Sequence, residues 1–138
     1  MFGYITVEVD RDSVCMGDDC QSHKKSIKIK RNTKISEFLA ILQEYVPAMK
    51  NVIWAIRSSD SIQGYIITDS NTQSKIEVYG SDALVVKRLS KKEIICKYYY
   101  PAKFSWIDGT TGNHIEQYAE CDTFLQKVKK DNEPTSMR

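Results

Sequence analysis

Residues 5–46 read ITVEVDRDSVCMGDDCQSHKKSIKIKRNTKISEFLAILQEYV, and this stretch decides the fold. Apolar and polar side chains alternate from Ile5 to Val9 and again from Ser26 to Lys30, which is the pattern of half-buried strands. Two such strands in series predict a hairpin. Their connection, from Asp10 to His23, is far longer than the ~2–5 residues that hairpin turns normally use. A connection of this length needs a structural or functional reason.

A helix is predicted directly after the second strand. Asn32 or Thr33 is expected to cap it, and Pro47 ends it near Val46. One stripe of the helix is apolar and formed by Ile35, Phe38, Leu39, Leu42, Tyr45 and Val46.

The remaining chain predicts more strands and one further helix. Residues 52–56 are apolar on both alternating faces, so we expect a central strand that is covered on both sides. Further strands are predicted at 64–67, at 76–79 and 84–86, which are short, and at 94–100, which is longer. Asp108-Gly109 is a turn signal for a last hairpin. From His114 onward the spacing of apolar residues favours a second helix. We expect a single domain over residues 1–132 and a mobile tail over 133–138.

These elements predict an α+β fold. The compact solution lays the helix of residues 35–46 across a mixed sheet, with strand 52–56 beside the first strand and parallel to it. This is the β-grasp (ubiquitin-like) arrangement, here extended by extra strands and a C-terminal helix.

Composition is that of an ordinary soluble globular protein. The chain has 138 residues, of which 41% are hydrophobic and 28% charged. A net charge of +2 is too small to argue for a nucleic-acid or membrane partner. No secretory signal or membrane-span pattern is visible, so we expect a cytoplasmic protein whose four cysteines are thiols.

Cys15, Cys20 and His23 form a Cys-x4-Cys-x2-His cluster of residue types that zinc prefers. A structural zinc site needs a fourth ligand, which His114 or Cys121 would have to supply. The alternative is that Cys15 packs as a small apolar residue under the loop. We therefore predict no metal and no other cofactor.

Catalytic patterns are also weak. His23 lies too close to Cys20 in sequence to suggest a preformed nucleophile and base. None of the glycines opens a helix after a strand, as a phosphate-binding loop requires. We predict that the protein is not an enzyme.

Charged residues gather in three places. Asp12, Asp18 and Asp19 either cap their own loop or offer an acidic patch to a basic partner, and both interpretations fit the pattern. The two basic stretches are interpreted as solvated surfaces or as protection of an edge strand, because neither contains interleaved aromatics for stacking on nucleic acid. They comprise Lys24, Lys25, Lys28, Lys30, Arg31 and Lys34, and Lys87, Arg88, Lys91 and Lys92.

An aromatic run lies near the last strand and includes Tyr98, Tyr99, Tyr100, Phe104 and Trp106. Exposed aromatic clusters are typical anchors of protein interfaces, and the alternative is that the C-terminal helix covers them. Alternation along the strand would bury either Tyr99 or its two neighbours but hardly all three, and we expect Tyr99 to be covered and Tyr98 and Tyr100 to be exposed.

The segment VEVDRDSVCMGDD (7–19) with HKK (23–25) resembles a group of small bacterial proteins that share an Arg-Asp-Ser-Val-x-x-Gly/Ala-Asp-Asp loop in a β-grasp setting. The likeness extends through Phe38-Leu39, Tyr45-Val46-Pro47 and Trp54, about the first half of the chain. Such proteins look like immunity or accessory partners in bacterial toxin systems, including contact-dependent growth inhibition. Where they tend to have a small residue and a proline before the histidine, this chain has Cys20-Gln21-Ser22.

The leading hypothesis is a non-enzymatic immunity protein that covers the active or substrate-binding surface of a cognate toxin and is a monomer when free. The runner-up is a ubiquitin-like adaptor, although the chain ends Thr135-Ser136-Met137-Arg138 without Gly-Gly. A small zinc- or thiol-dependent enzyme ranks third. The predicted partner contacts are Asp12, Asp18, Asp19, His23, Tyr98, Tyr100 and Trp106.

Overall fold

A computed structural model describes residues 3–12, 23–47, 52–59, 61–68, 74–100, 106–107, 114–115 and 121–132. The strands are β1 (Tyr4–Arg11), β2 (Lys25–Lys30), β3 (Val52–Ser58), β4 (Ser61–Thr68), β5 (Ser74–Val78), β6 (Glu93–Tyr99), β7 (Trp106–Ile107) and β8 (His114–Ile115). The helices are α1 (Ile35–Tyr45), α2 (Val85–Arg88) and α3 (Cys121–Asn132). Residues 133–138, the predicted tail, lie outside the described part.

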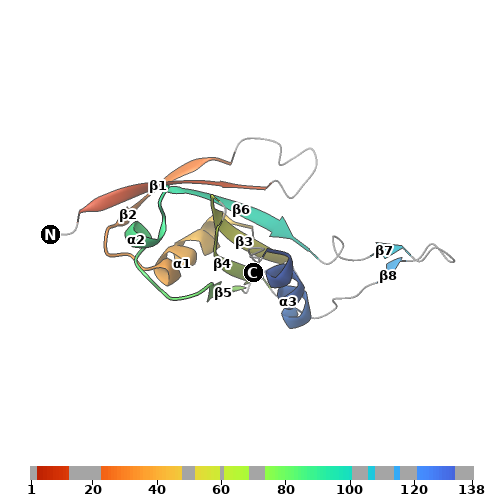
Figure 1. Cartoon of the computed structure of the whole chain (residues 1–138). Helices are drawn as coiled ribbons and strands as arrows, with labels where there is room; N and C mark the ends of the chain where they lie inside the picture. The colour runs from red at the N-terminus through yellow and green to blue at the C-terminus, as the bar shows by residue number, and fades with distance from the viewer. Residues whose placement is uncertain are drawn as a thin grey trace.

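The main sheet has six strands in the order β2-β1-β6-β3-β4-β5 and is strongly curled, like half of a barrel (Figure 1). The predicted α+β class is therefore confirmed, as is the antiparallel hairpin of β1 and β2. The predicted neighbour of β1 was wrong: β6 lies between β1 and β3. β6 is parallel to β1 and antiparallel to β3, so β3 runs against β1. Hydrophobic pattern identifies strands but not their partners, so a distant strand can insert between two neighbours in sequence.

The larger core fills the space between α1 and one face of this sheet. Apolar residues of α1 at the predicted helical spacing, including Phe38, Leu39 and Leu42, are buried against alternate residues of the strands, such as Val7 and Trp54. Gly64 of β4 allows close approach: a Cβ there would lie 2.5 Å from Leu39 Cδ1. The helix therefore packs directly on the backbone of β4.

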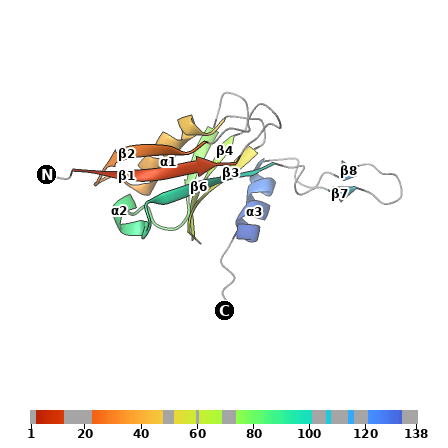
Figure 2. The same ribbon diagram turned by 90° about the horizontal axis from the view of Figure 1, so that it is seen from above.

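A smaller core lies on the opposite face, under α3. Phe124, Leu125 and Val128 of α3 pack with residues of β3 and β4, among them Ile53 and Tyr65. β3 is thus buried on both sides, as its sequence predicts. Lys129 also forms an ion pair with Glu77 of β5. Figure 2 shows α3 beside β3 and away from β1 and β2.

A distant carboxylate completes the start of α1, and the predicted caps Asn32 and Thr33 were wrong. Lys34 is the N-cap residue, and its backbone N–H donates to Glu37 Oε1 over 2.9 Å. Asp82 accepts the backbone N–H of Ser36 (2.8 Å) and its hydroxyl (2.6 Å). A carboxylate from the segment before α2 therefore satisfies an N–H group that the helix leaves unpaired.

Two other elements differ from prediction. The predicted strand 84–86 is absent: Leu84 is the N-cap residue of α2, and Val85 begins the helix. Val85 and the C-cap residue Leu89, four residues apart, are both buried. The C-terminal helix starts at Cys121, whereas His114 and Ile115 form β8. β8 pairs with β7 in a separate two-stranded sheet, so the predicted last hairpin is present.

Candidate functional site

The long connection leaves and re-enters the sheet at one end. Asp12 follows β1 and His23 stands two residues before β2, so both flank residues 13–22. β6 is parallel to β1, so its carboxyl end, at Tyr98 and Tyr99, lies at the same end of the sheet. The structure thus brings four of the predicted contact residues to this end of the sheet: Asp12, His23, Tyr98 and Tyr100.

Asp12 is bonded to β6 through backbone and side chain. Its N–H donates to the Cys96 carbonyl over 3.1 Å, and its Oδ2 accepts the N–H of Tyr98 over 2.9 Å. Lys97 Nζ lies 3.9 Å from the same carboxylate oxygen. These contacts join the Asp12 carboxylate to β6 and not to the backbone of its own loop, which is the bond that the loop-capping interpretation predicts.

Tyr98 and Tyr100 form an aromatic stack that begins in the core. The ring of buried Trp54 lies 5.2 Å from that of Tyr98, and Tyr98 lies 5.0 Å from Tyr100. Both tyrosines are half-buried, so their predicted exposure was wrong, and Tyr99 is half-buried against the core under α3. Tyr98 and Tyr100 follow buried Ile94 and Cys96 at alternate positions of β6 and the residue after it, so they lie on the face that packs against the larger core.

His23 is held through its backbone, because the Tyr45 hydroxyl donates to the His23 carbonyl. Burial, with a smaller contribution from nearby Cys96, raises the pKa of Tyr45 to about 12. Burial likewise raises the pKa of the Cys96 thiol to about 12. Neither group is a nucleophile near neutral pH, since the thiolate or phenolate form is scarce there.

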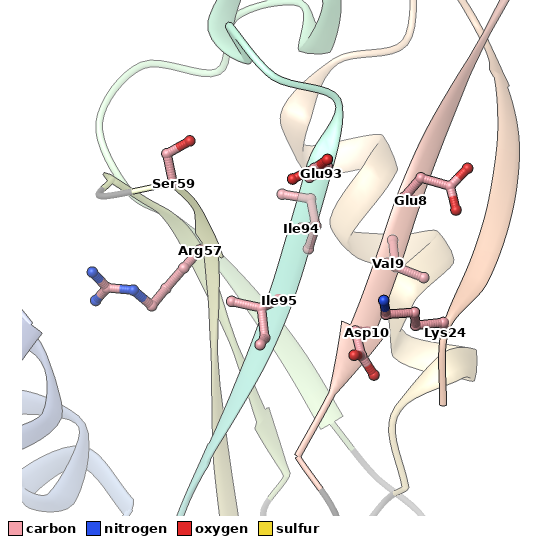
Figure 3. Close-up of a pocket in the computed structure, with 9 residues that line it drawn as sticks. All are labelled: Glu8, Val9, Asp10, Lys24, Arg57, Ser59, Glu93, Ile94 and Ile95. Carbon is pink, nitrogen blue, oxygen red and sulfur yellow. The ribbon is translucent and has the colours of Figure 1, made fainter. Parts of the chain in front are cut away.

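A charged pocket of about 410 Å³ opens on the face of the sheet away from α1 (Figure 3). Glu8 and Asp10 project from β1, and β6 contributes Ile95, which is 40% exposed. Ser26 donates to Glu8 Oε2 over 2.7 Å. The lining has three acidic and two basic side chains among nine residues, which are Glu8, Val9, Asp10, Lys24, Arg57, Ser59, Glu93, Ile94 and Ile95.

The pocket adjoins the predicted contact residues. Asp10 stands two residues before Asp12, and Lys24 directly follows His23, so one border of the pocket is formed by both ends of the long connection. Sequence reasoning missed Arg57 because it did not predict which strands would meet. The sequence did contain a signal for part of the pocket, because the alternation of β1 places Glu8 and Asp10 on the same polar face of the strand.

Comparison of the chain with protein-family models, with curated proteins and with solved structures finds no match.

Several of the predicted site residues do not belong to the end of the sheet formed by Asp12, His23 and Tyr98. Cys15, Asp18, Asp19 and Cys20 lie outside the described residues. Trp106 starts β7 and so belongs to the two-stranded sheet rather than to the sheet of Tyr98. Within the described ranges, no group of three or more His, Cys, Asp and Glu side chains is arranged to hold a metal ion.

None of the helices in the described part is both long and apolar enough to cross a bilayer. The charged pocket, with its acidic groups and two cations, lies on the face of the sheet away from α1, whereas the stacked rings of Tyr98 and Tyr100 pack on the α1 side. Both belong to the surface near the end of the sheet where residues 13–22 leave and re-enter it. Such a surface is suited to binding, because its side chains are held by a firm scaffold.

Proposed function

We propose that the chain is a non-enzymatic immunity protein that acts in the cytosol and neutralises a bacterial toxin by covering its active or substrate-binding surface. The observation that carries the proposal is the gathering of Asp12, His23, Tyr98 and Tyr100 where residues 13–22 leave and re-enter the sheet. A scaffold that presents a long acidic connection between charged and aromatic groups suits recognition of another macromolecule.

Within the α+β class, the specific fold that we propose is β-grasp. Its support is the order β2-β1-β6-β3-β4, with α1 following the first hairpin and a parallel pair, β1 and β6, at the centre. β5, α3 and the short β7-β8 hairpin are then additions to that plan. A ubiquitin-like adaptor fits the same plan, so it is retained as the second candidate.

The chemistry of the pocket indicates the kind of toxin surface that would fit. Three carboxylates, those of Glu8, Asp10 and Glu93, outnumber the two cations in the lining, and Asp12 lies next to Asp10 on the border. A basic surface is therefore the complementary partner, as many toxins that act on nucleic acid possess. Charge complementarity would accelerate encounter, and the aromatic groups would slow release.

The test is co-expression of the chain with the product of the adjacent upstream gene, followed by pull-down and by growth of cells that express that product. We expect a stable complex and full protection. Glu93→Lys reverses one exposed charge of the pocket, and we expect the Kd to rise at least about tenfold, mainly through a slower association rate.

A matched control raises the net charge equally at a distance. Ala40→Lys with Gln126→Lys adds two positive charges at exposed positions of α1 and α3 and should leave binding unchanged. Equal weakening by both variants would assign the effect to net charge and reject the pocket as the contact. Absence of both complex and protection would reject the toxin-binding role and favour the adaptor.

A further inference from the structure

The outer edge of β2 is unlike the other edge of the sheet. β2 is the terminal strand next to β1, and no other strand of the described ranges pairs with its second edge. At the opposite edge, β5 is flanked by both long helices, through a hydrogen bond between Gln43 and Ser74 (2.9 Å) and the ion pair of Lys129 with Glu77. An edge strand presents backbone N–H and C=O groups that can pair with another strand.

A groove runs along this edge, between β2 and α1. Its volume is about 410 Å³, and Ile27 of β2 and Ile41 of α1 supply its apolar part. Ile41 is 41% exposed, among the most exposed large apolar side chains of the described residues, and Ile27 is half-buried. The complete lining is Lys25, Ser26, Ile27, Lys28, Ile41, Glu44 and Tyr45. A groove with an apolar part beside an edge strand is a geometry that can receive alternate side chains of an added strand.

The other face of β2 is cationic. Lys28 and Lys30 point away from Ile27 and Ile29, and Lys28 Nζ lies 4.9 Å from the ring centre of Tyr4. A strand added beside β2 would send its side chains alternately to these two faces. The complementary strand therefore alternates apolar residues, which enter the groove, with acidic residues, which lie opposite the lysines.

We infer that this edge binds an extended segment of a partner protein in which apolar and acidic residues alternate, by adding it as a further strand beside β2. A second copy of this chain fits poorly, since pairing β2 with itself would place lysines opposite lysines, which is destabilising. The inference goes beyond the toxin-binding proposal, because the groove lies on the α1 side of the sheet and the charged pocket on the other.

The test uses fluorescent peptides of about seven residues, the usual length of a strand. One alternates Val or Ile with Asp or Glu, and a second has the same composition with its apolar and acidic residues in separate blocks. We expect the alternating peptide to bind and the block peptide to bind at least about tenfold more weakly. Hydrogen exchange should show new protection at alternate backbone amides of Ser26–Lys30.

Variants of exposed residues separate the electrostatic contribution of the β2 lysines from the apolar contribution of the groove. Lys28→Glu with Lys30→Glu should weaken binding at least about tenfold, and Ile41→Ala about threefold or more. Lys87→Glu with Lys91→Glu, also exposed, makes the same change in net charge elsewhere and should have no effect.

Three results would overturn the inference. They are absence of binding by the alternating peptide at about 1 mM, equal binding by the block peptide, and equal weakening by the two lysine pairs. Equal binding by the block peptide would point to a general attraction for polyanions, nucleic acid included. The peptides involve no toxin, so this inference and the immunity proposal can fail separately.

Discussion

Asp12 and Tyr98 join the end of β1 to the end of β6, because the Asp12 carboxylate accepts the Tyr98 backbone N–H over 2.9 Å. The same aspartate stands at the start of the long connection, and the ring of the same tyrosine lies 5.2 Å from that of Trp54 in the core, tilted by 45°. One hydrogen bond thus joins the proposed contact surface to a strand residue that packs on the larger core.

This bond predicts different effects for two substitutions of Asp12. Asp12→Ala leaves the Tyr98 N–H without its acceptor and should lower the free energy of unfolding by about 1 kcal/mol. Asp12→Asn keeps an acceptor oxygen and should cost less than half as much, while removing the charge that a basic partner would contact. Urea unfolding measures both values, and equal losses for the two variants would show that the charge, not the acceptor, stabilises this end.

Gly64 predicts a packing penalty. A Cβ at this position would lie 2.5 Å from Leu39 Cδ1 and 2.7 Å from the Glu77 carbonyl oxygen, so Gly64→Ala should destabilise by about 1–3 kcal/mol. Adding Leu39→Ala removes one of the two clashing groups, and the double variant should lose less than the sum of the single losses. Strict additivity in denaturant unfolding would mean that Leu39 is not the group that resists the new methyl.

Asp82 predicts a pH dependence of stability. The hydrogen bonds from the Ser36 hydroxyl and backbone lower the pKa of Asp82 below 3.8. A carboxyl whose pKa is lower in the folded state stabilises above its unfolded pKa, and this contribution is lost as the pH falls through the folded value. Asp82→Asn should therefore lower the Tm near neutral pH, with a difference from wild type that narrows below about pH 4. Glu44→Gln, at another exposed acid, serves as the control, and a constant difference across pH would remove Asp82 as the source.

We expect the Cys96 thiol to resist alkylation in the folded protein. This thiol is fully buried and its pKa is raised to about 12, so iodoacetamide near pH 8 should leave it unmodified in the folded protein. After unfolding in guanidinium chloride the same thiol should react completely. Mass spectrometry of the Cys96 peptide reads the outcome, and rapid native labelling would mean that β6 opens readily.

The sequence predicted local elements better than their partners. The hairpin of β1 and β2, α1, and the two-sided burial of β3 all follow from periodicity within one segment. The position of β6 between β1 and β3 and the capping of α1 by Asp82 depend on residues far apart in the chain. Periodicity contains no information about which distant segments meet.

In the candidate site, too, the sequence predicted individual residues better than the contacts between distant segments. Asp12, His23 and Tyr98 were chosen from the sequence, and the structure gathers them because β1 and β6 are parallel neighbours. The half-buried stack of Tyr98 and Tyr100 was not predicted, because it depends on which face of β6 meets the core and on the pairing of Tyr98 with Trp54 of β3. Arg57 and Glu93 were missed for the same reason, since they reach the pocket from strands whose neighbours were unknown.

The central claim is that the end of the sheet around Asp12, His23 and Tyr98 binds a protein toxin. Hydrogen exchange of the chain with and without the purified product of the adjacent upstream gene tests it most directly. The account predicts slower exchange on binding at residues 10–12, 23–24 and 97–100, with α2 and β5 unchanged. No change anywhere in the chain, or protection confined to α2 and β5, would contradict it.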